Sequence, residues 1–93
     1  MRYIDVRWLH ESAQDPIRLV SELDAAGWEQ RKLEFFVGGR VAFACATRAA
    51  DGTALGEAPV PPLPEINAQS EFDGVEIDAA AFEALWREHG VAG

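Results

Sequence analysis

Residues 4–8 alternate between apolar and charged side chains. Ile4, Val6 and Trp8 occupy every second position, and an acidic and a basic residue lie between them. Since successive side chains of a β-strand point to opposite faces of a sheet, a period of two is typical of a strand with one buried face. Residues 2–10 are therefore expected to form a strand.

Two further strands are expected on either side of Gly38-Gly39. The flanking runs, residues 28–37 and 40–47, are rich in apolar and aromatic residues, and paired glycines readily adopt the positive φ angles of a two-residue hairpin turn. Such a turn would place residue 33 opposite residue 44 and give the hairpin two distinct faces. The first face would be wholly apolar, half of its side chains would be small, and a helix could pack closely on it. It would contain Leu33, Phe35, Val37, Ala42, Ala44 and Ala46. The second would mix aromatic and charged groups and would hold Trp28, Lys32, Glu34, Phe36, Val41, Phe43 and Cys45.

The segment 16–24 fits either a helix or a strand. A helix would have Asp15 as its N-cap and Pro16 at its first position. A strand would use the period of two that begins with Ile17 and Leu19. The local signals favour the helix slightly and leave both alternatives open.

The second half of the chain has a different character. Residues 49–62 form an expected connector, because Asp51-Gly52 marks a turn and the prolines that follow favour extended backbone. Residues 63–90 are expected to be mainly helical, with a short helix first and a longer one capped by Asp78. The apolar stripe of the longer helix follows the helical spacing and contains Phe82, Leu85, Trp86 and His89.

The charge of the chain is concentrated in this second half. The 93 residues include 16 acidic and 8 basic side chains, a formal net charge of −8. The first 48 residues hold seven of each sign, whereas residues 49–93 hold nine acids and the single base Arg87. A negative surface argues against nucleic acid and favours a basic partner.

The acidic half therefore indicates a non-catalytic protein-interaction role, of the kind that inhibitor or immunity proteins have. Such a surface should bind a basic protein, and the affinity should fall as salt is added; an affinity that salt leaves unchanged would contradict it. The candidate contact residues are Glu71, Asp73, Glu76 and Asp78.

The sequence offers little support for catalysis. Cys45 is the single cysteine, the two histidines are far apart in sequence, and no metal, phosphate-loop or nucleophile-elbow motif is present, so no metal or cofactor is expected. No apolar run is long enough to span a membrane and no signal peptide is apparent, which favours a cytoplasmic protein without membrane contact. The alternative function is that of a small-molecule binding module or minor enzyme, which would use the second hairpin face and a nearby histidine: Trp28, Lys32, Phe36, Phe43 and His10.

Several short blocks of residues resemble a family of small, uncharacterised bacterial proteins. The resemblance runs from about residue 3 to residue 87 and departs from the family at Gly38, where members usually have Asp. It implies no activity and no functional residue, but it favours a strand over residues 17–23. The blocks are Trp8-x-His10, Ser21-Glu22-Leu23-Asp24, Trp28-Glu29-x-Arg31-Lys32-x-Glu34-x-Phe36, Gly39-Arg40, Leu55-Gly56-Glu57-x-Pro59, Glu65-Ile66-Asn67 and Phe82-Glu83-x-x-Trp86.

Together these patterns predict one α+β domain over residues 1–93. Residues 1–48 would form a four-stranded antiparallel meander, in which 16–24 is the second strand. A short helix and a longer C-terminal helix, both from residues 63–90, would pack on one face of that sheet.

Overall fold

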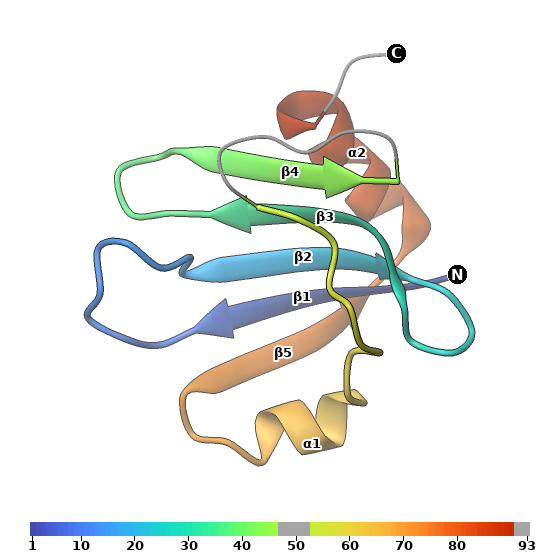
Figure 1. Cartoon of the computed structure of the whole chain (residues 1–93), viewed down its shortest axis with the longest axis horizontal. Coiled ribbons are helices and arrows are strands. Elements are labelled where there is room, and N and C mark those ends of the chain that lie inside the picture. Colours follow the sequence, from blue (N-terminus) through green and yellow to red (C-terminus); the bar gives the residue numbers. More distant parts are fainter. Residues whose placement is uncertain (47–52, 91–93) are drawn as a thin grey trace.

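The computed structural model describes residues 1–46 and 53–90. Five antiparallel strands form one sheet in the order β4-β3-β2-β1-β5, and two helices accompany it (Figure 1). The elements are β1 (Arg2–Trp8), β2 (Arg18–Leu23), β3 (Glu29–Phe35), β4 (Val41–Cys45), α1 (Leu63–Asn67), β5 (Phe72–Ile77) and α2 (Ala79–His89).

The α+β class and the antiparallel sheet are confirmed, but the predicted number of strands is wrong. Strands β1 to β4 follow one another across the sheet, and 16–24 contains a strand, not a helix. The fifth strand, β5, lies beside β1 within the segment that was expected to be mainly helical. Its buried position is Gly74, which has no side chain, so the sequence shows no hydrophobic alternation there.

The predicted register of the β3–β4 hairpin is wrong by one residue. Leu33 lies opposite Phe43, not Ala44. Although Gly38 and Gly39 both have a φ of 95°, the loop contains three residues, because the amide of Phe36 donates to the carbonyl of Arg40 at 2.9 Å. A slip of one residue exchanges the faces of one strand relative to the other. The expected apolar floor, which combined Leu33, Phe35 and Val37 with Ala42, Ala44 and Ala46, therefore does not form.

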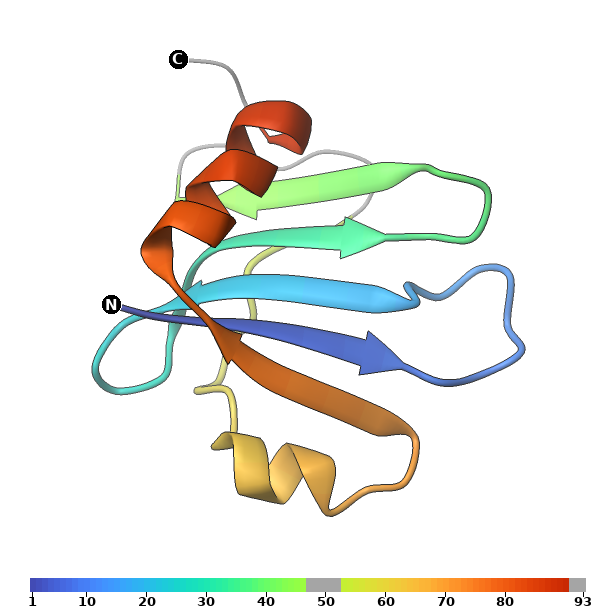
Figure 2. The same cartoon turned by 180° about the vertical axis from the view of Figure 1, so that it is seen from behind.

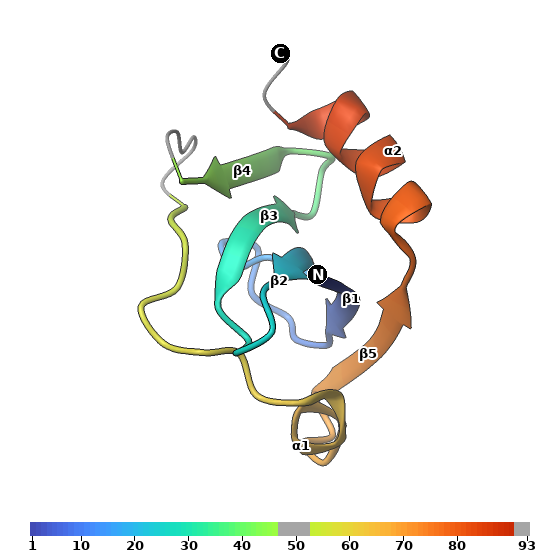
Figure 3. The ribbon, with the colours of Figure 1, turned by 90° about the vertical axis from the view of Figure 1, so that its right-hand side faces the viewer.

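Different segments cover the two faces of the sheet. Helix α2 lies over one face, here called the α2 face, whereas residues 53–62, here called the connector, cross the opposite, connector face (Figures 2 and 3). The predicted residues 49–52 of the connector, like residue 47 of the predicted fourth strand, lie outside the described residues. The connector face also carries α1, so the expected packing of both helices on one face is not confirmed.

Each face has its own buried cluster of side chains. On the α2 face, two strand residues contact the stripe that the sequence predicts for the C-terminal helix; this cluster contains Val20, Leu33, Phe82 and Trp86. On the connector face, residues from β1 and β2 contact α1, and this cluster contains Ile4, Val6, Leu23 and Ile66. The carboxylate of Asp78 accepts from the amide of Ala81 at 2.8 Å and so caps α2, as its position before the helix predicts.

Arg31 fastens α2 to the sheet. Its guanidinium donates two hydrogen bonds of 2.8 Å to the carboxylate of Glu22, which is only 7% exposed, and one of 2.7 Å to Glu83 on α2. It also lies 4.8 Å from the ring centre of Phe82 and 5.1 Å from that of Trp86. One side chain of β3 thus joins β2 and α2 through charge and aromatic contact at once.

Acid is expected to weaken the fold through Glu22. The hydrogen bonds from Arg31 lower the pKa of the Glu22 carboxyl, although its burial opposes them. A lowered pKa in the folded state stabilises the protein above the unfolded value of about 4.3, and this stabilisation is lost as the pH falls through the folded value. In urea denaturation between about pH 3 and 7, Glu22→Gln should therefore show a shallower loss of unfolding free energy on acidification than the unchanged chain. Equal slopes in the two proteins would contradict this assignment.

Candidate functional site

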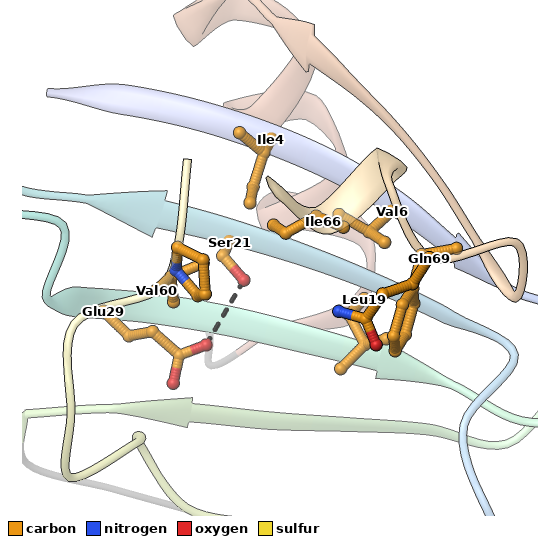
Figure 4. Close-up of a pocket in the computed structure, with 10 residues that line it drawn as sticks. Ile4, Val6, Leu19, Ser21, Glu29, Val60, Ile66 and Gln69 are labelled. Atoms are coloured by element: carbon orange, nitrogen blue, oxygen red, sulfur yellow. Dashed lines mark hydrogen bonds between the residues drawn. The ribbon is translucent and has the colours of Figure 1, made fainter. Parts of the chain in front are cut away.

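A pocket of about 310 Å³ opens on the connector face of the sheet. Strands β1 and β2 form its floor, the connector forms one wall, and α1 with the start of β5 forms the other (Figure 4). Most of the lining is apolar, and the polar members gather at the two ends. The lining residues are Ile4, Val6, Leu19, Ser21, Glu29, Val60, Pro61, Ile66, Gln69 and Phe72.

The α1 wall is held in place by the side chain of Asn67. Its amide nitrogen donates to the carbonyl of Gly74 at 2.9 Å, and its amide oxygen accepts from the Gly74 N–H at 2.7 Å. These two bonds satisfy backbone groups of β5 as a neighbouring strand would. A Cβ at residue 74 would lie 2.8 Å from Cδ2 of Leu63 and 3.1 Å from Cγ2 of Val6, so a larger residue there would displace these side chains. The contact places the buried Ile66 over the floor of the pocket.

The connector wall is attached to the sheet at two points. The amide of Val60 donates to the carbonyl of Gly27 at 2.8 Å, and the amide of Gly56 donates to Oε1 of Glu29 at 2.6 Å. Gly27 has a φ of 90°, and a Cβ there would lie 3.1 Å from the carbonyl oxygen of Val60. The turn between β2 and β3 therefore needs glycine both for its conformation and for the approach of the connector.

A β-bulge brings Glu29 to the pocket. Along most of β3 the register with β2 is regular, and Glu22 lies opposite Arg31. The register then shifts so that Leu23 lies opposite Glu29, which leaves Gln30 as the additional residue. Without this shift Glu29 would share the face of Glu22; with it, Glu29 points to the connector face.

The bulge places Glu29 next to a buried hydroxyl. Oγ of Ser21 donates to Oε2 of Glu29 at 3.4 Å, and Ser21 is only 4% exposed. Lys32 Nζ lies 3.6 Å from Oε1 of Glu29 and 4.0 Å from Oε2 of Glu34. Two carboxylates and one ammonium give this polar cluster a formal charge of −1. The arrangement offers hydrogen-bond acceptors and negative charge at one end of an apolar pocket.

The structure separates the residues of the predicted second hairpin face. Lys32 points to the connector face, whereas Phe43 lies on the α2 face, where its ring is edge-on to Trp86 with a centroid distance of 6.0 Å. The difference follows from the one-residue change in the hairpin register. Phe36 lies in the hairpin turn, where the guanidinium of Arg40 covers its ring at 3.9 Å.

The other two residues of the predicted ligand site, Trp28 of the hairpin face and the additional His10, lie in segments that connect strands. His10 follows β1, and both of its ring nitrogens hold the loop: Nε2 lies 2.7 Å from the carbonyl oxygen of Pro16, and Nδ1 accepts from the amide of Ser12 at 3.0 Å. Trp28 lies between β2 and β3 and is 40% exposed. The histidine thus organises its loop and does not face the pocket.

The four predicted partner-binding acids lie along β5 and at its two ends. Each lies on the surface, but they do not share one face, because side chains alternate along a strand. Glu71 accepts from Nε1 of Trp8 at 3.3 Å, Glu76 lies 3.8 Å from Arg2, and Asp78 caps α2. Recognition of a basic partner through these residues stays a prediction. The exposed residues are Glu71, Asp73, Glu76 and Asp78.

Sequence reasoning missed the pocket residues Ser21 and Glu29. Both lie within blocks that carry the family resemblance, which was the available signal, but neither block indicates that the two side chains meet. In the described part of the chain, no group of three or more His, Cys, Asp and Glu side chains could hold a metal ion. None of the helices in residues 1–46 and 53–90 is both long and apolar enough to span a membrane.

Comparison with known protein families identifies a matching family. Residues 2–91, nearly the whole chain, match the model of a protein family described as "Domain of unknown function (DUF6881)". No curated protein and no solved structure matches the chain.

Proposed function

Since this chain belongs to DUF6881, a family of domains of unknown function, we propose a function for it from the geometry of its pocket. The proposed function is the binding of a small, largely apolar molecule that has one polar end. The observation that carries it is the apolar pocket on the connector face, with Ser21 and Glu29 together at one end.

The size and lining of the pocket support binding. Pockets for small molecules typically have volumes of about 300–1,000 Å³, with mostly apolar walls and a few polar groups that orient the ligand. The volume of about 310 Å³ lies at the lower end of that range, which favours a compact molecule. The connector and α1 are each fastened to the sheet by two hydrogen bonds, so both walls are preorganised.

The polar groups of the pocket favour binding without catalysis. An activated serine needs a base that takes its proton and a donor that stabilises the resulting oxyanion. The base that Ser21 contacts is the carboxylate of Glu29, at a distance of 3.4 Å that is long for proton transfer, and no histidine is among the ten lining residues. The pair therefore orients a ligand in this proposal and does not attack it.

The proposal predicts that a pocket-filling variant loses ligand binding. Three probes share a pentyl group and differ in the polar group attached to it: pentan-1-ol, pentan-1-amine and hexanoate. Each would be titrated into the ¹⁵N-labelled protein. At least one should shift the amide resonances of the residues that line the pocket. Val60→Trp should abolish these shifts, because an indole at position 60 occupies the space beside the connector.

A matched substitution separates this effect from a general effect of tryptophan. Val75 is 54% exposed on β5 and is not among the lining residues, so Val75→Trp should leave the shifts unchanged. Dispersed spectra of both variants would show that each is folded. Shifts that persist in Val60→Trp, or that never centre on the pocket with any probe, would refute the proposed function.

A further inference from the structure

We infer that the molecule bound in this pocket carries a protonated primary amine, and that the amine lies beside Ser21 and Glu29. This inference rests on the proposed function, because it specifies the ligand of the same pocket. It follows from the hydrogen-bonding groups, the charge and the apolar walls that the described residues bring together.

The polar atoms at this end of the pocket are hydrogen-bond acceptors. A serine hydroxyl has one hydrogen and two lone pairs, and Ser21 directs its hydrogen to Oε2 of Glu29. The hydroxyl of Ser21 can therefore only accept hydrogen bonds from a ligand. An ionised carboxylate can only accept hydrogen bonds, so Glu29 also requires a donor. A ligand group that donates several hydrogen bonds fits this pair.

Glu29 retains capacity to accept another hydrogen bond. A carboxylate has about four lone-pair sites. The contacts of Oε1 are with the amide of Gly56 at 2.6 Å and with Nζ of Lys32 at 3.6 Å. Oε2 accepts from Ser21 at 3.4 Å, which is near the upper limit for an O–H···O bond and leaves room for a shorter one. A ligand ammonium could therefore approach Oε2.

The local charge favours a cation over an anion. Glu29 and Glu34 flank the single ammonium of Lys32, and the side chains of Glu29 and Lys32 are only 10% and 12% exposed. Charges with little solvent around them interact more strongly than charges on the surface. No basic residue is among the ten that line the pocket, and the nearby ammonium of Lys32 is already flanked by Glu29 and Glu34, so a carboxylate ligand would meet acceptors and a net negative charge.

The remainder of the pocket determines the rest of the ligand. Away from Ser21 and Glu29, the floor and walls consist of aliphatic and aromatic side chains, and Gln69 lies at the opposite end (Figure 4). A hydrocarbon chain buries apolar surface here without leaving a polar group unpaired. The geometry thus fits a compact alkylamine, with the ammonium at one end and hydrocarbon along the floor.

The three pentyl probes test this assignment in the unmodified protein. At neutral pH, pentan-1-amine should bind about tenfold more tightly than pentan-1-ol, because a hydrogen bond to a charged group is stronger than one between neutral groups. Hexanoate should bind most weakly. The dissociation constants would come from the same amide-shift titrations. Any shifts that pentan-1-amine still causes in Val60→Trp would measure its attraction to the acidic surface outside the pocket, to be subtracted.

A pair of charge-removing variants identifies the carboxylate responsible. Glu29→Gln keeps the size of the side chain but removes its charge, so it should abolish the preference for the amine over the alcohol. Glu65→Gln is the matched control, because Glu65 is exposed on α1 and is not among the lining residues. It removes the same charge elsewhere and should preserve the preference.

The outcomes distinguish failure of the inference from failure of the proposed function. If no probe shifts the pocket resonances, the proposed function fails and the inference fails with it. If pentan-1-ol or hexanoate binds as tightly as the amine, the pocket still binds ligands but the inference is overturned. A preference that survives in folded Glu29→Gln also overturns it. If Glu29→Gln does not fold, the ranking of the three probes by the unmodified protein decides.

Discussion

Replacing Arg31 by methionine is expected to lower the free energy of unfolding by about 3–5 kcal/mol. The loss arises because the carboxylate of Glu22, 7% exposed, is left without its two hydrogen bonds from Arg31. Helix α2 also loses its charged link through Glu83 and the cation that lies over the ring of Phe82. Urea denaturation at neutral pH, followed by far-ultraviolet circular dichroism, measures the change.

Arg18 provides a matched control for this substitution. It also makes a two-bond contact with a carboxylate, that of Asp5, at 2.9 and 2.6 Å, and lies 4.7 Å from the ring centre of Phe35. Its side chain is more exposed than that of Arg31, 32% against 22%, and it makes no bond to α2 among the described contacts. Arg18→Met should therefore cost about 1 kcal/mol. A loss at Arg31 no larger than at Arg18 would show that the attachment of α2 does not depend on Arg31.

Replacing Phe82 by alanine is expected to cost about 3–5 kcal/mol as well. Its side chain is fully buried, with ring centroids 5.2 Å from Tyr3 and 6.2 Å from Trp86. Its removal leaves a cavity between α2 and the sheet that the remaining side chains cannot fill, since the backbone of both elements is held by other contacts. The same urea titration measures the loss of unfolding free energy.

Leu85 lies on the same helix and serves as the comparison for Phe82. It is only partly buried at the edge of the cluster, so Leu85→Ala should cost about 1 kcal/mol. Similar losses at the two positions would mean that α2 is held by general contact along its length. A much larger loss at Phe82 would identify one aromatic ring, placed below Arg31, as the anchor of the helix.

The sequence predicts elements with one buried side better than elements that are buried on both sides. Strand β1 and helix α2 each have one buried side, so their apolar residues recur with a clear period. Strand β2 lies in the middle of the sheet, and Val20, Ser21, Glu22 and Leu23 are all buried. With both faces covered there is no alternation to detect, and the resemblance to a family, not the local pattern, identified this strand.

Two single-residue details limited the prediction of the faces. The Gly38-Gly39 pair correctly indicates a hairpin, but two- and three-residue loops can both use glycines with positive φ, and the choice decides which side chains share a face. Strand β5 was not predicted because its buried residue, Gly74, has no side chain and so gives no hydrophobic signal. The predicted ligand face combined Lys32 with Phe43, and the register places these two on opposite sides of the sheet.

The pocket could not be predicted from the sequence for a related reason. Its lining comes from strands near the N-terminus, from the connector and from α1, segments whose meeting depends on the whole topology. The contacts that assemble it are backbone bonds to Gly27 and Gly74 and the amide of Asn67, none of which produces a hydrophobic pattern. Short-range patterns therefore predicted individual strands and helices. Prediction of the pocket would have required knowledge of how segments far apart in the sequence pair with one another.

The bulge at Gln30 determines on which side of the sheet the charge of Glu29 lies. In a regular ladder that kept every residue, Gln30 would lie opposite Leu23 and Glu29 would fall on the α2 face. Deletion of Gln30 would instead leave Glu29 directly before Arg31 and still opposite Leu23, so the carboxylate would stay on the connector face. The side on which this charge lies therefore withstands both substitution and loss of residue 30, and it changes only if Gln30 itself pairs with β2.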